Sequence, residues 1–171
     1  APWPLEELDL ESNDLSAVAA GRALVALSRH AGLRLLSVNE CQLSDAGFKS
    51  LVEAPWPALT HLSARWARVA LDGPHALGAG AFAGFPVLEK LDLWHVKLGE
   101  AGAALLASQL WPRLVKLGLV DCRIAAAALA ALARGAWPAL EELDLRHHKL
   151  GAPLALEDAR QWAPALVELL Q

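Results

Sequence analysis

Cysteine is scarce in this chain, and both membrane-length apolar runs and an excess of basic residues are missing. Only two cysteines occur, Cys41 and Cys122, which is too few for a disulfide-stapled scaffold. The longest apolar runs are short and alanine-rich, as at 124–133, and fall below the roughly 18 residues that a membrane-spanning helix needs. The formal net charge is −4, whereas nucleic-acid-binding domains normally display a basic surface. The sequence therefore predicts neither membrane insertion nor a nucleic-acid partner.

The N-terminus has no starting methionine and no basic-then-apolar leader. Its first four residues, Ala-Pro-Trp-Pro, run directly into a leucine pattern at Leu5. We therefore expect a processed protein or a part of a longer one. The 171 residues, of which 55% are apolar and 20% charged, suit one soluble domain with one core.

A leucine pattern recurs along almost the whole chain. Complete segments of the form L-x-x-L-x-L-x-x-N/C-x-L, some with substitutions, begin at Leu5, Leu33, Leu59, Leu88, Leu114 and Leu140. A truncated segment begins at Leu166, and the successive starts are 28, 26, 29, 26, 26 and 26 residues apart. Such a period is typical of proteins built from stacked units, because one unit cannot bury its leucines alone and its neighbours cover them.

This pattern resembles the leucine-rich-repeat family. The period and the alanine- and leucine-rich second halves resemble its ribonuclease-inhibitor-like subclass. The resemblance implies an α/β solenoid of about six repeats, with parallel strands on the concave face and helices on the convex face. It also implies a single domain over 1–171 that is a fragment of a longer array without caps. Its open ends would then contact neighbouring repeats or subunits.

The local patterns agree with that architecture. Within each unit the leucines alternate with polar residues, the period-two pattern of a strand that is buried on one face. The second halves change to helical spacing, with small residues where a helix lies close to the sheet, at 99–107 and 124–132. Ser44 is expected to cap the helix that begins after it. The third unit is irregular, with four glycines between 73 and 84, and we expect a bulged or locally disordered outer segment there.

An aromatic–proline pair lies three and two residues before the first leucine of most units. The pairs are Trp56-Pro57, Phe85-Pro86, Trp111-Pro112 and Trp137-Pro138, with Trp162 and Pro164 as a near match. Proline favours an extended approach to the strand. Because the aromatic side chains recur with the period of the core, we interpret them as packing residues between successive helices rather than as a ligand platform.

The ninth position of a unit normally carries asparagine or cysteine, whose side chain satisfies backbone groups in the turn. Asn13, Cys41 and Cys122 keep this pattern. Ala67, Val96 and His148 depart from it, so we expect an incomplete side-chain ladder. The two thiols are predicted to be buried, which favours a reducing, intracellular compartment.

The sequence contains few residues that are arranged for metal binding or catalysis. His95 and His147 occupy equivalent positions two units apart with Asp121 between them, and strand spacing would place the two histidines roughly 10 Å apart, too far for a shared zinc ion. His147 and His148 are adjacent on a strand pattern and should point to opposite faces. The thiols are expected to be buried, and no nucleophile or phosphate-binding motif is present. We predict no metal, no cofactor and no enzymatic activity.

Polar residues that flank the strand leucines should form a partner-binding face, at positions three, five, seven and eight of each unit. Trp66 and Trp94 lie on neighbouring units outside the aromatic–proline series, where the core does not need them. Exposed tryptophan beside arginine and histidine is typical of interface hot spots; alternatively, the two tryptophans fold down onto the sheet. The predicted partner-binding residues are Glu11, Asn39, Arg65, Trp66, Asp92, Trp94, His95, Asp121, Arg146 and His147.

The leading functional hypothesis is a protein–protein interaction module that binds another protein on the concave face. A second hypothesis is a structural subunit of a large complex, with its open ends covered by neighbours. A third is an activator of a GTPase or another regulatory effector, which some relatives in the family are, although no polar residue here indicates that role.

Overall fold

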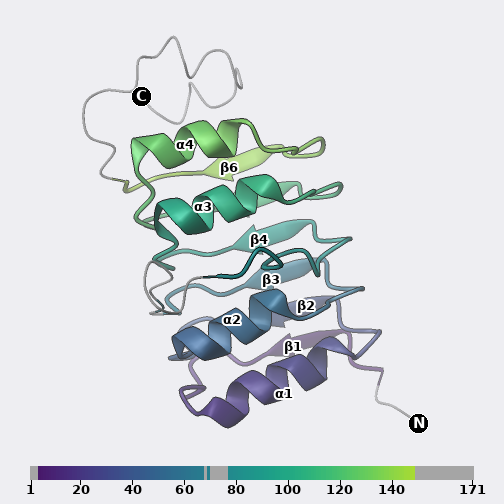
Figure 1. Cartoon of the computed structure of the whole chain (residues 1–171). Helices are drawn as coiled ribbons and strands as arrows, with labels where there is room; N and C mark the ends of the chain where they lie inside the picture. The colour runs from purple at the N-terminus through teal and green to yellow at the C-terminus, as the bar shows by residue number, and fades with distance from the viewer. Residues whose placement is uncertain (1–3, 68, 70–76, 149–171) are drawn as a thin grey trace.

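The computed structural model describes residues 4–67, 69 and 77–148. The truncated seventh unit and the pair formed by Trp162 and Pro164 lie outside the described residues. The chain forms an α/β structure with a sheet on one side and helices on the other (Figure 1). None of the helices in the described part is long and apolar enough to cross a membrane.

Among the residues that the structure describes, six short strands form one parallel sheet in chain order. They are β1 (Glu7–Asp9), β2 (Leu35–Ser37), β3 (His61–Ser63), β4 (Lys90–Asp92), β5 (Lys116–Gly118) and β6 (Glu142–Asp144). Equivalent positions of successive units pair across the sheet, so that Leu36 is opposite both Leu8 and Leu62. The same register continues to β6. Each unit therefore adds its strand beside the previous one, as the repeat predicts.

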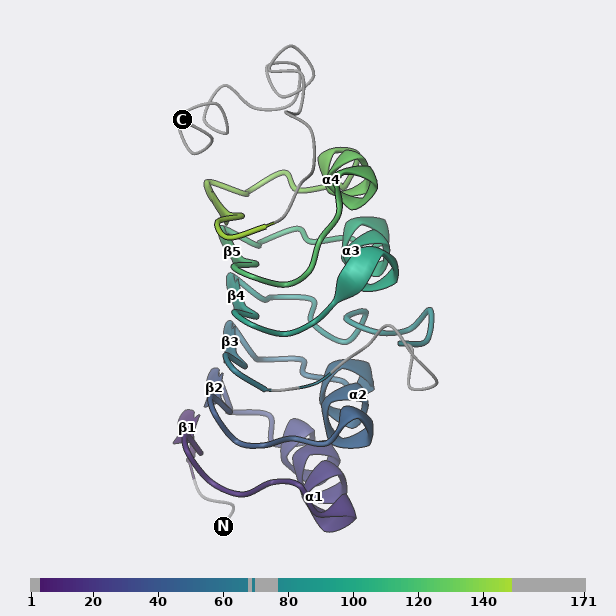
Figure 2. The same ribbon diagram turned by 90° about the vertical axis from the view of Figure 1, so that its left-hand side faces the viewer.

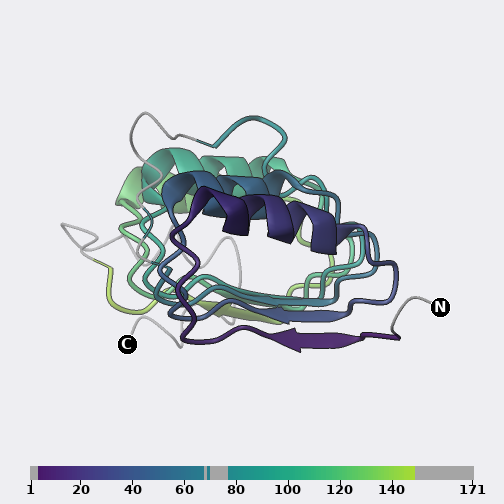
Figure 3. The same cartoon turned by 90° about the horizontal axis from the view of Figure 1, so that it is seen from below.

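In the described part of the chain, four helices make the second layer, on one side of the sheet (Figures 2 and 3). They are α1 (Val18–Ser28), α2 (Asp45–Glu53), α3 (Gly99–Ser108) and α4 (Ala126–Ala133). Helix α1 packs on α2, and α3 packs on α4. Between β3 and β4, the described residues 77–89 contain no helix. The irregular third unit was expected to differ here, and the remainder of that segment lies outside the described residues.

Local sequence explains where the helices begin and how closely they pack. Ser44 caps α2 as predicted, because its Oγ accepts a hydrogen bond from the backbone N–H of Gly47 at 3.2 Å. In α3, a Cβ atom at Gly102 would lie 3.0 Å from the Cβ of Leu98. Only glycine fits at that position without movement of the neighbouring leucine. The helices predicted over 99–107 and 124–132 are confirmed as α3 and α4.

The central leucines of the strands form a continuous column beneath the helices. Leu36, Leu62, Leu91 and Leu117 are at most 2% exposed. The corresponding leucines of the outer strands, Leu8 and Leu143, are only partly buried. Each fully buried leucine contributes on the order of 2 kcal/mol through removal of apolar surface from water. The column that the repeat predicts is therefore fully buried at β2 to β5 and partly buried at β1 and β6.

The tryptophans of the aromatic–proline pairs that the structure describes pack in or against the core, as predicted. Their indole N–H groups also donate hydrogen bonds to carbonyls near the ends of the helices. The indole N–H of Trp56 donates to the carbonyl of Leu51, 2.8 Å away near the end of α2. Trp111 and Trp137 make the same bond with the carbonyls of Leu106 and Leu132, at 2.9 and 2.8 Å. The last carbonyls of a helix have no partner within it. Each indole therefore donates to a carbonyl of the last helical turn while its ring packs in or against the core.

Candidate functional site

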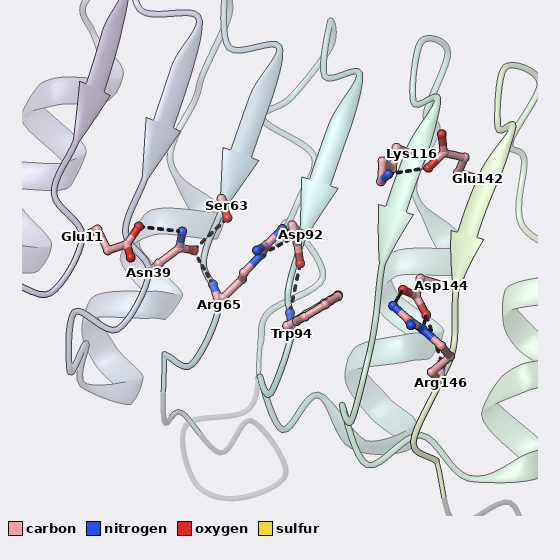
Figure 4. A network of polar contacts seen from close by, with 10 residues as sticks. All are labelled: Glu11, Asn39, Ser63, Arg65, Asp92, Trp94, Lys116, Glu142, Asp144 and Arg146. Atoms are coloured by element: carbon pink, nitrogen blue, oxygen red, sulfur yellow. Dashed lines mark hydrogen bonds and ion pairs between the residues drawn. The ribbon is translucent and has the colours of Figure 1, made fainter.

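The face of the sheet that points away from the helices, called the open face below, carries a network of ordered polar side chains (Figure 4). Asn39 links the first three strands. Its Oδ1 accepts hydrogen bonds from the Oγ of Ser63 at 2.7 Å and from the backbone N–H of Arg65 at 2.8 Å. Its Nδ2 donates to Glu11 at 3.5 Å. Three of the predicted partner-binding residues, Glu11, Asn39 and Arg65, are therefore joined.

The network continues from Arg65 to β4. The guanidinium of Arg65 contacts Oδ2 of Asp92 through Nε at 2.7 Å and through Nη2 at 2.6 Å. The other carboxylate oxygen of Asp92 accepts a hydrogen bond from the backbone N–H of Trp94 at 3.3 Å. The guanidinium carbon of Arg65 lies 4.8 Å from the centroid of the Trp94 ring. A cation at this distance from a ring is attracted to it, so Arg65 holds both the carboxylate and the indole.

A second arginine approaches Trp94 from β6. Arg146 makes two side-chain bonds to Asp144, at 2.9 and 2.6 Å, and its guanidinium carbon lies 5.8 Å from the Trp94 centroid. The hydrogen bond from the Arg146 side chain lowers the pKa of Asp144. We call Arg65, Asp92, Trp94, Asp144 and Arg146 the Trp94 group. It spans the open face from the end of β3 to the end of β6.

The aspartates of this group belong to a motif whose role the sequence reasoning missed. In three units the aspartate between two leucines accepts a hydrogen bond from the backbone N–H two residues later: Asp9 from Glu11 at 2.9 Å, Asp92 from Trp94, and Asp144 from Arg146 at 3.2 Å. The recurring Leu-Asp-Leu phrase is the signal that could have predicted this turn. The carboxylate fixes the chain where the strand ends.

Gly118 makes room for the Trp94 side chain. A Cβ atom at Gly118 would lie 3.3 Å from Nε1 of Trp94 and 3.0 Å from Oδ1 of Asp92. The indole of Trp94, in the turn after β4, therefore lies directly over the backbone of β5. Glycine within a strand often marks such a close approach, and this signal was present in the sequence but was not interpreted.

The residues at position eight lie in turns and not on strands, which corrects the expected placement. All six have left-handed backbones, with φ between 52° and 63°: Ser12, Glu40, Trp66, His95, Asp121 and His147. The strands contain only three residues each, and a turn follows each of them. Position eight therefore lines the edge of the sheet beside the open face.

Trp66 belongs to this edge and forms a second group with its neighbours. It is 48% exposed and stacks on His95, with ring centroids 3.4 Å apart. Nδ1 of His95 lies 2.9 Å from Oδ2 of Asp121. We call Trp66, His95, Asp121 and His147 the Trp66 group, because all four line one hollow at the edge of the sheet.

Trp66 and Trp94 were expected to form a single hot spot. The backbone N–H of Trp66 does donate to the carbonyl of Trp94, at 2.8 Å. However, their side chains belong to different groups, Trp66 at the edge and half-buried Trp94 in the groove of the open face. The predicted partner-binding residues are therefore divided between two adjacent surfaces.

The groove of the open face has a volume of about 540 Å³ and is lined by the Trp94 group and by cationic side chains. His61, Lys90 and Lys116 lie side by side at position three of β3, β4 and β5. Lys116 forms an ion pair with Glu142 of β6. Burial, and next the charge of Lys90, lower the pKa of His61.

The histidines do not assemble a metal centre in the described residues, where no group of three or more metal-ligating side chains is found. His147 is exposed, whereas its neighbour His148 is partly buried and its Nε2 lies 2.7 Å from the carbonyl oxygen of Leu119. The two side chains therefore have different environments, although both lie after β6 and not on the strand.

Both thiols are free and buried, as predicted. The Sγ of Cys41 donates to the carbonyl of Leu10 at 2.8 Å, and that of Cys122 donates to the carbonyl of Leu93 at 3.0 Å. Burial raises the pKa of Cys41, and it raises the pKa of Cys122 to about 12. A thiol in this state is a poor nucleophile, and its role is to satisfy backbone carbonyls.

No protein-family model matches this sequence, and a search among curated proteins finds no similar one. The function proposed next therefore depends on the repeat pattern and on the geometry of the open face.

Proposed function

We propose that this chain is a leucine-rich-repeat solenoid of the ribonuclease-inhibitor-like subclass, and that it binds another protein on its open face. Six consecutive parallel strands in one register, with helices on the other side, support the architecture. In such an arrangement every unit contributes side chains to one continuous surface.

The observation that carries the proposal is the ordered network across the open face. Asn39, Arg65, Asp92 and Trp94 connect side chains from the turn after β1 to the turn after β4 by hydrogen bonds and one arginine–indole contact. A surface whose side chains are already held in place loses less conformational entropy when a partner binds. Arginine and tryptophan are also the residue types that contribute most to binding energy in protein interfaces.

Binding, and not catalysis, is the proposed mode of action. The carboxylates of Asp92 and Asp144 are each engaged by an arginine, and both thiols are buried in bonds to backbone carbonyls. The charged side chains of the Trp94 group therefore position one another. Free buried thiols also fit a protein that works in a reducing, intracellular compartment.

A comparative pull-down tests the proposal. The chain would be affinity-tagged and exposed to an extract of its native source, alongside the variants Trp94→Ala and Leu110→Ala, and the retained proteins would be compared by mass spectrometry. Leu110 is the matched control because it is 73% exposed and does not line the groove. Loss of a specific protein with Trp94→Ala but not with Leu110→Ala is expected. Equal retention by all three chains would contradict a role for the open face.

A structural subunit of a larger complex is the second candidate, and one observation favours it. Leu8 and Leu10 of the first unit are only partly buried, whereas the equivalent Leu36 and Val38 of the second unit are buried. A permanent neighbour could cover these leucines. Size-exclusion chromatography distinguishes the candidates: a monodisperse monomer favours the interaction module, and aggregation of the isolated chain favours the subunit.

A further inference from the structure

Lys90 carries a positive charge at the centre of the open face. It is opposite His61 on β3 and opposite Lys116 on β5, and neighbouring strands are about 4.8 Å apart. Lys116 forms an ion pair with Glu142. Within the described parts of the chain, Lys90 has no acidic partner. Like charges directly opposite each other on paired strands are destabilising, so this arrangement costs stability in the isolated chain.

The carboxylates nearest in the groove are already occupied. Asp92 bonds to the guanidinium of Arg65 and to the backbone of Trp94. Asp144 bonds to Arg146 through two side-chain contacts. Four strongly cationic side chains therefore line the groove: Arg65, Lys90, Lys116 and Arg146. Three of them, Arg65, Lys116 and Arg146, have acidic partners. One positive charge remains for a ligand to neutralise.

An apolar surface lies at a defined distance from that charge. Trp94 follows Lys90 by four residues, so their Cα atoms are at most about 13 Å apart along the strand direction. The indole lies over Gly118, where no side chain of β5 competes for the space. The groove contains both Lys90 and Trp94. A binding partner therefore meets one cation and one aromatic ring at a separation that an extended peptide spans in three or four residues.

We propose that the groove binds an extended, acidic segment of the partner protein, an inference that rests on the proposed function. A carboxylate of that segment pairs with Lys90, and an apolar side chain three or four residues away contacts Trp94. Neutralising Lys90 removes its repulsion with Lys116, so binding stabilises the sheet as well as the complex. The other positions of the groove carry charges that are already paired, and they favour uncharged side chains of the ligand.

A peptide selection tests this inference. A displayed library of random peptides, each of about 12 residues and so long enough to cross the groove, would be selected on the folded chain. Selected peptides should carry Asp or Glu three or four residues from an aromatic or aliphatic residue. One such peptide, labelled with a fluorophore, would then be titrated by anisotropy with the wild-type chain and with Lys90→Glu. The acidic peptide should bind the variant at least about tenfold more weakly, as expected for a like-charge contact.

The variant Lys90→Glu should also gain affinity for a peptide of opposite charge. Such a gain is not expected if Lys90 only stabilises the fold. A version of the peptide in which lysine replaces the acidic residue should bind Lys90→Glu more tightly than it binds wild type. The variant keeps the fold, because the new carboxylate lies opposite Lys116, and its melting temperature should not fall. Arg22→Glu is the matched control: it makes the same charge change on the exposed side of α1, and it should leave the binding of both peptides unchanged.

Three outcomes would overturn the inference. Selected peptides without an acidic bias would show that Lys90 is not the anchor, and failure of the library to enrich any peptide would exclude an extended ligand. Equal binding by a single-stranded oligonucleotide, with the same loss in Lys90→Glu, would show a general anion site. None of these results decides whether the open face binds a folded protein, which the pull-down with Trp94→Ala tests separately.

Discussion

Nε2 of His148 donates a hydrogen bond to the carbonyl oxygen of Leu119 over 2.7 Å, at the place where cysteine serves in other units. The equivalent bonds run from Cys41 to Leu10 and from Cys122 to Leu93. In each case the side chain at position nine reaches a carbonyl of the preceding unit. His148 was expected to interrupt this ladder, and that expectation was wrong, because a ring nitrogen can donate as an asparagine amide does.

The same histidine makes the fold sensitive to acid. Nδ1 of His148 accepts a hydrogen bond from the backbone N–H of Ile124 at 3.3 Å, and protonation of Nδ1 would break this bond, whereas the donation from Nε2 to Leu119 is kept. Burial lowers the pKa of His148 below its ordinary value of 6.5. The unfolded chain therefore binds more protons than the folded chain as the pH falls through about 6.5. We expect the free energy of unfolding, measured in urea, to be constant above pH 7.5 and to decrease from pH 7 towards pH 5.

The variant His148→Asn is the control for this pH dependence. Asparagine can donate to Leu119 without titrating, so the loss of stability between pH 7 and pH 5 should be smaller than in wild type. The remainder should come from His61, whose pKa is also lowered by burial, and His61→Gln should reduce it further. An unchanged slope in the double variant would contradict the assignment. Carboxylates such as Asp144, whose pKa is lowered from 3.8, act only at lower pH.

Replacing Trp111 by phenylalanine tests the helix-ending role of the indoles. The substitution keeps most of the packing but leaves the carbonyl of Leu106 without the N–H that lies 2.9 Å from it. The carbonyl of Leu106 keeps the backbone N–H of Gln109 at 3.3 Å, so only one hydrogen bond is lost, and the free energy of unfolding should fall by about 0.5–1.5 kcal/mol in urea titrations. Trp66→Phe, a substitution at a half-exposed ring, is the control and should change stability little. Equal effects would show that the Trp111 hydrogen bond is unimportant.

The close approach of Trp94 to Gly118 decides whether a larger side chain at position 118 stabilises or destabilises the fold. Valine is favoured in strands, and by that rule Gly118→Val should stabilise β5. Because its side chain would meet Trp94 and Asp92 at distances near 3 Å, we expect a loss of about 1–3 kcal/mol instead. In the background Trp94→Ala the same substitution should be markedly less harmful, which a double-mutant cycle in urea measures. Additive effects would mean that the indole does not occupy this space.

Much of the fold could be predicted from the sequence because it depends on short-range periodicity. The spacing of leucines such as Leu36 and Leu62 placed all six strands in register, and the small residues before Leu106 marked α3. The aromatic–proline pairs were correctly interpreted as packing residues. These features repeat with the unit, so each one was supported by several observations.

The arrangement of the candidate site was less predictable, because it depends on turns and on side-chain rotamers. The left-handed φ of 56° at Trp66 moves this residue from the strand to the edge of the sheet, and no residue type announces it, since Glu40 and His95 adopt the same conformation. The pairing of Arg65 with Asp92 requires knowledge of neighbours 27 residues apart in sequence. Only the Leu-Asp-Leu phrase and Gly118 carried a signal that could have been used.

The environment of the thiols predicts their reactivity. Burial raises the pKa of Cys122 from the ordinary value of 9.0 to about 12, so at pH 8 it holds far less thiolate than a free cysteine. Neither Cys41 nor Cys122 should react with a chromogenic disulfide reagent in the folded chain, and both should react in urea. Rapid modification of one thiol under native conditions would contradict the buried ladder position.

Alanine substitutions of the two tryptophans separate the groove from the edge. Trp66 is 48% exposed and contacts His95, so Trp66→Ala should change the free energy of unfolding by less than about 0.5 kcal/mol. Trp94 contacts two guanidinium groups, each worth about 0.5–1 kcal/mol at an accessible site, so Trp94→Ala should cost about 1–2 kcal/mol. The double variant should still melt cooperatively, only a few degrees below wild type, but it should bind the partner recovered in the pull-down more than about tenfold more weakly, because tryptophans at the centre of an interface carry much of its binding energy. Titrations of the single variants then show whether the partner contacts the Trp94 group, the Trp66 group or both. If melting of the double variant collapses, the indoles are core residues, and the functional role assigned to them is wrong.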